Sequence, residues 1–371
     1  MERTDFLIIG AGIAGASAAY ELSARGQVIL LERESQPGYH TTGRSASMFL
    51  ETYGNETIRA LTTGSRRFFL DPPDGFAAHR LLTPRGSLSV GRRDQLSELD
   101  RTADALGAKA RRLDAAETLR LVPVLRPEVV AGGILEPDAM DVDAHGLHQG
   151  FLRGLRARGG RLVVDGEVRS LSRADGAWLA ETPAGSFTAP VVVNAAGAWS
   201  DQIAELAGAR TVGLVPKRRT VITFDPPAGQ AIEDWPLVVG IAEEFYFKPD
   251  AGRLLGSPAD ETPMAPCDVQ PEELDVAVAV DRIQTMAALE IKRIHNKWAG
   301  LRSFVADKSP VVGFDPACEG FFWLAAQGGY GMQTSPAMGR LTAALATGAP
   351  LPADLADLGV STAALTPARW A

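Results

Sequence analysis

The sequence predicts an α/β fold in which a parallel-sheet domain is interleaved with an α+β domain built on an antiparallel sheet. The first observation is a strand, a glycine turn, a helix and a second strand within residues 5–33, an order that makes the two strands parallel. The second is a series of short strand-like segments over residues 213–302, separated by Pro, Asp or Gly, which favours antiparallel pairing. The length of 371 residues suits two domains, and 46% apolar residues can fill their cores.

Composition and charge exclude several classes of protein. Asp and Glu number 45 against 37 Lys and Arg, and this acidic balance argues against nucleic acid as the main partner. The two cysteines, Cys267 and Cys318, form no CxxC pair, so neither a disulfide framework nor a zinc site is expected. The uncharged run over residues 6–20 is shorter than a bilayer span and follows no basic leader, so we expect a cytoplasmic protein with no integral membrane segment.

The first unit contains a phosphate-binding turn. Residues 5–9 form a buried strand, residues 14–25 suit a helix that ends at Gly26, and residues 28–31 form the second strand. In the turn between them, Gly10 permits the tight bend, Gly12 lets the backbone approach a pyrophosphate, and Gly15 allows the helix and strand to pack closely. Glu32 ends the second strand, where its carboxylate would accept hydrogen bonds from ribose hydroxyls. This Rossmann-like GxGxxG unit predicts a cofactor that carries adenosine diphosphate.

The next segments continue the same domain. A polar, Gly-rich stretch covers residues 38–46, and a helix is expected over 51–69, before Pro72 and Pro73. Asp143 is a plausible N-cap for a helix that runs to residue 158, where Gly159 and Gly160 stop it. Strands are expected over 161–164, 167–171, 178–181 and 191–193.

The pattern of predicted elements changes after residue 212 and returns to the first pattern after Trp298. Strand-like runs cover 219–224, 237–241, 245–248 and 253–256, and a helix with apolar spacing covers 272–289. After Trp298 the pattern returns to strand, glycine loop and helix. We therefore expect residues 1–80, 141–212 and 303–371 to form the domain that binds the cofactor and residues 81–140 and 213–302 to form the substrate domain.

Three downstream segments favour FAD over NAD as the cofactor. Residues 38–46 could line the extended pyrophosphate, the strand and small-residue loop over 191–199 suit close passage of a ligand, and the loop over 327–335 could face the flavin. Together with the first turn, they give the predicted cofactor-binding residues Gly10, Gly12, Ile13, Ala14, Gly15, Glu32, Arg33, Thr42, Gly43, Arg44, Ser45, Ala46, Val168, Ala196, Gly197, Trp199, Arg302, Gly328, Gly329, Tyr330, Gly331, Met332, Gln333 and Thr334. Neither cysteine lies in these segments, so the FAD is expected to be noncovalent.

With these motifs in place, the chain resembles the FAD-dependent D-amino acid oxidase and glycine oxidase (DAO) family over nearly its whole length, most closely its D-arginine dehydrogenase type. The most specific matches are the glycine turn and the segments 37–46, 193–199, 216–219, 298–302 and 327–333. The resemblance implies a flavin domain interleaved with a substrate domain, and the oxidation of a D-amino acid to an imino acid by hydride transfer from Cα to flavin N5. The imino acid then hydrolyses to a 2-oxo acid and ammonia.

Two side chains are candidates for holding the substrate. Arg302 can clamp a carboxylate in a bidentate pair, although an arginine there could also form a structural ion pair. Tyr246 could add a phenolic donor or simply be a core aromatic residue, and the resemblance favours the functional role. The resemblance also assigns Tyr53, Arg219, Gly329 and Gln333 to the catalytic site, and Met48, Leu50, Ser87, Leu237 and Val239 to the pocket for the substrate side chain.

The chain departs from the D-arginine dehydrogenase type at three of those positions. Ser87 replaces an acid, Met48 replaces a histidine and Leu50 replaces a threonine. These changes remove the group best suited to a guanidinium, so a neutral or apolar side chain is expected. D-arginine or D-lysine remains an alternative, as does a secondary or N-substituted amino acid such as sarcosine or proline.

Other charged groups are interpreted as structural. Lys217 and Arg218 are expected to form a solvated basic patch, and Arg153, Arg156, Arg158 and Arg161 an exposed helix face. His145 and His148 are expected to be solvated residues at a capped helix start, so no metal is predicted. A flavin-binding subunit without substrate chemistry is a third hypothesis. The electron acceptor could be oxygen or a quinone, and a quinone would make the protein membrane-peripheral.

Overall fold

A six-stranded sheet carries the predicted nucleotide-binding unit. The computed structural model describes residues 1–370, and in it the strand order is β10-β3-β2-β14-β22-β21, with every pair parallel except β21 with β22. These strands are β2 (Phe6–Ile9), β3 (Val28–Leu31), β10 (Arg161–Val163), β14 (Val191–Asn194), β21 (Val311–Phe314) and β22 (Phe321–Ala325). Each position of β2 and β3 is buried, as a strand covered on both faces requires.

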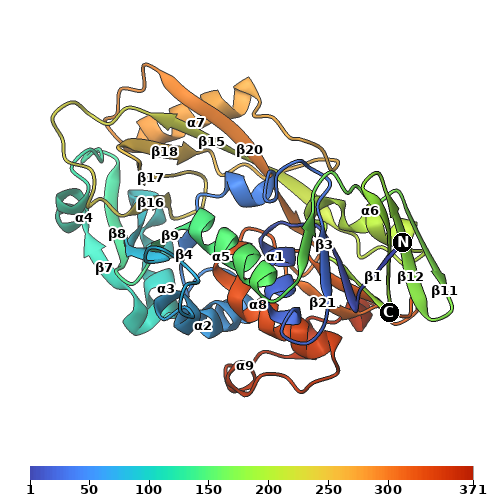
Figure 1. Cartoon of the computed structure of the whole chain (residues 1–371). Helices are drawn as coiled ribbons and strands as arrows, with labels where there is room; N and C mark the ends of the chain where they lie inside the picture. Colours follow the sequence, from blue (N-terminus) through green and yellow to red (C-terminus); the bar gives the residue numbers. More distant parts are fainter. Residues whose placement is uncertain (371) are drawn as a thin grey trace.

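Helices cover one face of this sheet and a smaller sheet covers the other. Figure 1 shows α1, α5 and α8 close together near the centre of the molecule. The helices on that side are α1 (Ile13–Leu22), α2 (Glu56–Leu70), α5 (Ala144–Ala157) and α8 (Gly331–Ala346). The other face packs against α6 (Ser200–Leu206) and the sheet β1-β13-β12-β11, formed by β1 (Glu2–Arg3), β11 (Ser170–Ala174), β12 (Ala177–Thr182) and β13 (Gly185–Ala189).

The second large sheet has nine strands and lies at the upper left of Figure 1. Its strand order is β19-β15-β18-β17-β16-β6-β8-β7, and β20 pairs with β15. The strands are β6 (Ser87–Arg92), β7 (Arg111–Asp114), β8 (Val130–Glu136), β15 (Val215–Phe224), β16 (Leu237–Gly240), β17 (Tyr246–Asp250), β18 (Arg253–Ser257), β19 (Thr262–Pro263) and β20 (Ile294–Phe304). One face packs on α3 (Leu96–Leu106), α4 (Ala115–Leu121) and α7 (Glu273–Met286).

Short elements join the two systems. A three-stranded sheet combines β4 (Met48–Phe49), β5 (Leu82–Pro84) and β9 (Met140–Val142). The 3-10 turn η1 (Thr41–Arg44) lies beside β20, and α9 (Ala353–Asp357) packs near α2. We propose that the two large sheets belong to two domains divided at the boundaries expected from the sequence, with β20 crossing the boundary at residue 302.

The predicted element types are largely confirmed, with shifted limits. The helix that begins at residue 144 is capped as expected, because the Asp143 carboxylate accepts a hydrogen bond from the Gly146 amide at 2.8 Å. The helix expected from residue 51 begins instead at Glu56, where the Asn55 side chain caps it by accepting from Ile58 N. The large sheet is not wholly antiparallel, since β16 and β6 pair in parallel.

Two of the structural interpretations are wrong. Arg218 is not solvated, because it lies on the inner face of β15 with its side chain 3% exposed, beside Asp260, Glu272 and Asp275. Its Nη2 lies 2.8 Å from Asp275 Oδ2. His148 is also buried, and its Nε2 lies 2.9 Å from the Ala11 carbonyl oxygen, so it supports the glycine turn. Burial lowers the pKa of His148, which favours the neutral ring.

We predict that Arg218→Met destabilises the protein strongly. Removing the guanidinium leaves Asp260 and Asp275 facing each other without their cation, and breaking such a buried ion pair typically costs about 3–5 kcal/mol. Thermal and urea unfolding would measure the change, with Arg156→Met as the control at an exposed helix position. A Tm of the Arg218 variant equal to that of the control would contradict the prediction.

Candidate active site

The glycine turn between β2 and α1 is built so tightly that side chains are excluded. Gly10 adopts φ +101°, and a Cβ there would lie 2.5 Å from the Ala195 carbonyl oxygen. A Cβ at Gly15 would lie 1.9 Å from the Gly10 carbonyl oxygen. The turn therefore packs against the loop after β14. The N-terminus of α1, where helices favour a phosphate, opens on the cavity, and there the Ile13 amide donates to Thr42 Oγ1 at 3.0 Å.

Glu32 is fixed at the end of β3. Its side chain is buried, and the two carboxylate oxygens accept hydrogen bonds from the amides of Ala11 and Glu34, each at 3.0 Å. Burial raises the pKa of Glu32, while these two amide bonds oppose the shift. The carboxylate thus stays at the edge of the cavity where a ribose would lie.

Two adjoining cavities run along the carboxyl ends of the parallel strands. One extends from the turn past Glu32, Arg33, Val168, Ala196 and Trp199. The other extends past Ile13, Ala14, Arg44, Ser45 and Ala46 to Arg302, Gly328, Gly329, Gly331 and Met332. Both are lined by Gly12, Thr41, Thr42, Ala195, Gly197 and Ala198, so a long ligand could pass from one to the other at this point.

Five of the predicted cofactor residues lie outside the lining of both cavities: Gly15, Gly43, Tyr330, Gln333 and Thr334. Gly15 serves packing, whereas Gly43 lines a neighbouring hollow. Sequence reasoning in turn missed Thr41, which lines both cavities, and Gln327, which lines the second. Both could have been found, since Thr41 adjoins the predicted Thr42 and Gln327 adjoins the predicted glycine loop.

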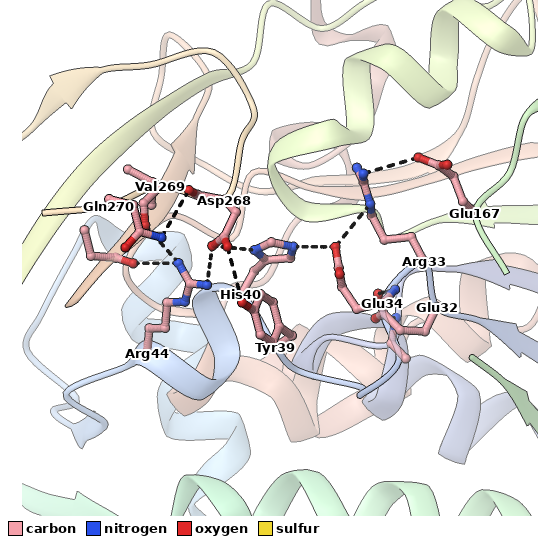
Figure 2. Close-up of polar contacts among 12 residues, drawn as sticks. Glu32, Arg33, Glu34, Tyr39, His40, Arg44, Glu167, Asp268, Val269 and Gln270 are labelled. Atoms are coloured by element: carbon pink, nitrogen blue, oxygen red, sulfur yellow. Dashed lines mark hydrogen bonds and ion pairs between the residues drawn. The ribbon is translucent and has the colours of Figure 1, made fainter. Parts of the chain in front are cut away.

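A belt of polar contacts crosses from the nucleotide side to the large sheet (Figure 2). Arg44 lies 2.5 Å from Asp268 Oδ1 and donates to the carbonyl oxygens of Val269 and Ala299 at 3.1 and 3.0 Å. The Tyr39 hydroxyl donates to Asp268 Oδ2 at 3.2 Å, and the His40 ring lies 2.9 Å from Glu34 Oε1. Hydrogen bonding to Arg44 lowers the pKa of Asp268. No sequence motif pointed to Asp268.

Strand register places three candidate substrate-binding residues on one face of the large sheet. β15 pairs with β20 so that Lys217 opposes Arg302 and Arg219 opposes Gly300, and alternation along the strands puts Arg219 and Arg302 on the same face. Arg219, Tyr246 and Arg302 all line the second cavity.

The two arginines differ in their protein partners. The Arg219 side chain donates to the Asp260 carbonyl oxygen at 2.9 Å and lies 3.3 Å from Glu261 Oε1. Burial, followed by repulsion from Arg302, lowers the pKa of Arg219. Arg302 has no carboxylate within 4 Å in the described residues. Burial lowers the pKa of Arg302, but the phenols of Tyr53 and Tyr246 outweigh it and the net shift is upward.

Tyrosines surround the Arg302 guanidinium. Tyr246 is 8% exposed, and its hydroxyl is buried without a hydrogen-bond partner. The rings of Tyr53 and Tyr330 pack edge to face with centroids 5.0 Å apart. Burial and the nearby Tyr53 raise the pKa of Tyr330 to about 12, so this phenol stays protonated at neutral pH. These groups offer O–H donors to an anion held by Arg302.

The glycine loop between β22 and α8 lies against Arg302. A Cβ at Gly329 would lie 2.9 Å from Arg302 Nη1, so a side chain there would displace the guanidinium. Gln333 is buried and fully engaged by the protein: its Oε1 accepts from Leu50 N at 3.2 Å and its Nε2 donates to Thr62 Oγ1 at 2.8 Å. The Gln333 amide therefore holds the segment that carries Leu50.

The residues predicted for the side-chain pocket lie next to Tyr246. Met48, Leu237 and Val239 pack in one apolar cluster with Tyr246. Ser87, 2% exposed, opposes Leu237 in the parallel pair and Glu136 in the antiparallel pair. Leu50 lies beyond this cluster, where its backbone contacts Gln333. The side of Tyr246 formed by Met48, Leu237 and Val239 is thus apolar.

Comparison of the sequence with known families decides its relationship. The profile of the family described as FAD dependent oxidoreductase (DAO) matches residues 5–345. The chain belongs to the DAO family. Glycine oxidase of Bacillus licheniformis is 26% identical over 94% of this chain and 95% of that protein. Human mitochondrial sarcosine dehydrogenase is 25% identical over 85% of this chain but 36% of its own length. Among solved structures, L-proline dehydrogenase from P.horikoshii has a TM-score of 0.84 at 20% identity, covering 100% of this chain and 98% of that one.

FAD is the cofactor of this DAO-family enzyme, and the residues present fit it. The helix N-terminus and glycine cradle suit the pyrophosphate, Glu32 suits a ribose, and the cavity past Thr42 continues to the glycine loop below Arg302. No helix in residues 1–370 is long and apolar enough to cross a membrane, and no cluster of three potential metal ligands occurs there.

We predict that Asp268→Asn accelerates FAD release. The substitution removes the charge that holds Arg44 and His40 across the cavity edge, and partly exposed ion pairs contribute about 0.2–1 kcal/mol, equivalent to about a 1.5- to 5-fold change. The rate of FAD release would be measured by diluting the holoenzyme and following the fluorescence of free FAD. Asp281→Asn on the exposed face of α7 is the control, and equal release rates for the two variants would contradict the prediction.

Proposed function

We propose that this enzyme oxidises the Cα–N bond of a D-amino acid with a neutral or apolar side chain, giving an imino acid that hydrolyses to a 2-oxo acid and ammonia. The finer relationship to the D-arginine dehydrogenase type is part of this proposal. The acceptor of the electrons is proposed to be oxygen or a quinone.

One observation supports the proposal most directly. Arg302 lacks a carboxylate partner, and the buried Tyr246 hydroxyl beside it has no hydrogen-bond partner. Buried polar groups in proteins are nearly always paired, and a buried guanidinium usually has an anion. A substrate carboxylate would satisfy both groups at once, accepting a bidentate pair from Arg302 and a bond from the phenol.

The remaining residues would orient the substrate. With its carboxylate on Arg302, the Cα of the substrate would lie over the loop of Gly328 and Gly329, where the lack of side chains permits close approach. FAD, when bound, supplies the hydride acceptor. The apolar cluster of Met48, Leu237 and Val239 offers a neutral side chain favourable burial, about 1.5–3 kcal/mol for a Leu, Met or Phe.

A second candidate is a glycine, sarcosine or proline-like substrate. The apolar cluster of Met48, Leu237 and Val239 packs against Tyr246, which also suits a substrate that has little or no side chain. Relatives named for glycine and sarcosine support this candidate. Both candidates use the same carboxylate anchor, so substrate tests separate them.

We predict that Arg302→Met retains FAD but reduces kcat/KM for every amino acid substrate. Loss of a charge-assisted anchor costs about 1.5–3 kcal/mol, or about 10- to 150-fold, with a bidentate clamp at the upper end. The loss is measured from the rate of anaerobic flavin reduction at several substrate concentrations, monitored by flavin absorbance. An unchanged kcat/KM would show that another residue binds the substrate carboxylate, and Arg219 is the next candidate in the cavity.

We predict that D-methionine and D-phenylalanine are turned over with higher kcat/KM than D-arginine. An unpaired cation against apolar walls keeps its desolvation cost, whereas an apolar side chain gains from burial. Ser87→Glu should shift the ratio toward D-arginine, because the new carboxylate would oppose Glu136 and a cation would relieve that repulsion.

Ser87→Gln is the matched control, since it adds the same volume without charge. A wild-type enzyme that prefers D-arginine would show that another acid receives the cation. Glu136 would then be the nearest choice in the sheet register, since Glu51 is bound to Arg66.

A further inference from the structure

The segment of residues 50–53 is held at every residue by a different part of the molecule. Gln333 contacts the backbone N and O of Leu50, and Arg66 lies 2.5 Å from Glu51 Oε2. The Thr52 hydroxyl donates to the Glu136 carboxylate, and Tyr53 lies beside Tyr330 and Arg302. Two of these contacts reach the nine-stranded sheet: Thr52 bonds to Glu136 on β8, and Tyr53 lies beside Arg302 on β20.

Glu136 is a buried acid without a cationic partner in the part of the chain that the structure describes. It is the last residue of β8 and is 8% exposed, yet no lysine, arginine or histidine nitrogen lies within 4 Å of its carboxylate in residues 1–370. Thr52 is its one side-chain hydrogen-bond donor in that range. Burial raises the pKa of Glu136, and Arg59 and Lys109 lower it only from a distance. A buried acid without a cation is costly, so a role for it is expected.

The register directs Glu136 toward the substrate side of the sheet. It opposes Ser87, which opposes Leu237, and Leu237 packs with Tyr246. Neighbouring residues of β6 and β8, Leu88 and Leu135, pack on the opposite face. Glu136 therefore projects from the same face as the proposed substrate-binding groups.

We propose that Glu136 is a positioning residue that acts through Thr52 to fix Tyr53 beside Arg302. The role rests on the proposed function, in which Arg302 binds the substrate carboxylate. The Thr52 side chain bonds to Glu136, and the side chain of the adjacent Tyr53 lies beside Tyr330 and Arg302. A fixed Thr52 therefore limits the movement of Tyr53. Because the action is on the carboxylate end, it affects all amino acid substrates by the same factor.

The first test measures the segment itself and needs no substrate. Hydrogen exchange of the holoenzyme is compared for wild type, Thr52→Val and Glu136→Ala. We expect amides of residues 50–54 to exchange about tenfold faster in both variants, with β2 and β14 unchanged. Glu136→Gln and Thr52→Ser keep an acceptor and a donor and should stay near wild type. Unchanged exchange at 50–54, or faster exchange throughout the chain, would overturn the proposal.

The second test separates positioning from direct contact with the substrate. Thr52→Val and Glu136→Ala should each raise KM about 3- to 10-fold with kcat within about twofold, and the double variant should add nothing further. Glu290→Ala, at an exposed position, is the control. Effects confined to D-arginine and D-lysine, or additive effects of the two changes, would overturn it. If no amino acid reduces the flavin, the proposed function fails while the exchange result still decides the role of Glu136.

Discussion

The attachment of η1 to β20 is the constraint on which the site depends. The Thr41 hydroxyl donates to the Leu301 carbonyl oxygen at 2.7 Å, Arg44 donates to the Ala299 carbonyl oxygen, and the Trp298 indole donates back to Arg44 O at 3.1 Å. These bonds fasten a loop of the nucleotide-binding sheet along a strand of the other sheet. The cavity that contains Arg302 lies beside this seam, so an FAD held on one side would meet the substrate that we propose binds on the other.

Backbone close approach limits what the sequence can change at that seam. Gly10 lies in the turn near which the two cavities meet, and Gly329 lies beside Arg302; a Cβ at either position would come within 3 Å of Ala195 or Arg302. The first glycine keeps the turn against the loop after β14, and the second lets the Arg302 guanidinium approach the glycine loop. Gly10 is therefore fixed by its positive φ and its backbone contact, whereas Gly329 matters for the position of the Arg302 guanidinium.

The extent of prediction from sequence follows the range of the interactions involved. The glycine turn, Glu32 and the cap at Asp143 are local patterns, and the structure contains them where they were predicted. Arg218 was misjudged because the acids that surround it, Asp260 and Asp275, are 42 and 57 residues away in sequence. His148 was misjudged for the same reason, since its partner is the backbone of Ala11.

The charges that line the cavity bear on the number of carboxylate groups in the proposed substrate. Burial and then repulsion from Arg302 lower the pKa of Arg219, but Arg219 already has Glu261 at 3.3 Å. Arg302 alone lacks a protein anion. One added carboxylate would balance it, whereas a second would have to compete with Glu261 for Arg219. For the proposed function, a monocarboxylic amino acid would therefore match the electrostatics of this cavity better than a dicarboxylic one.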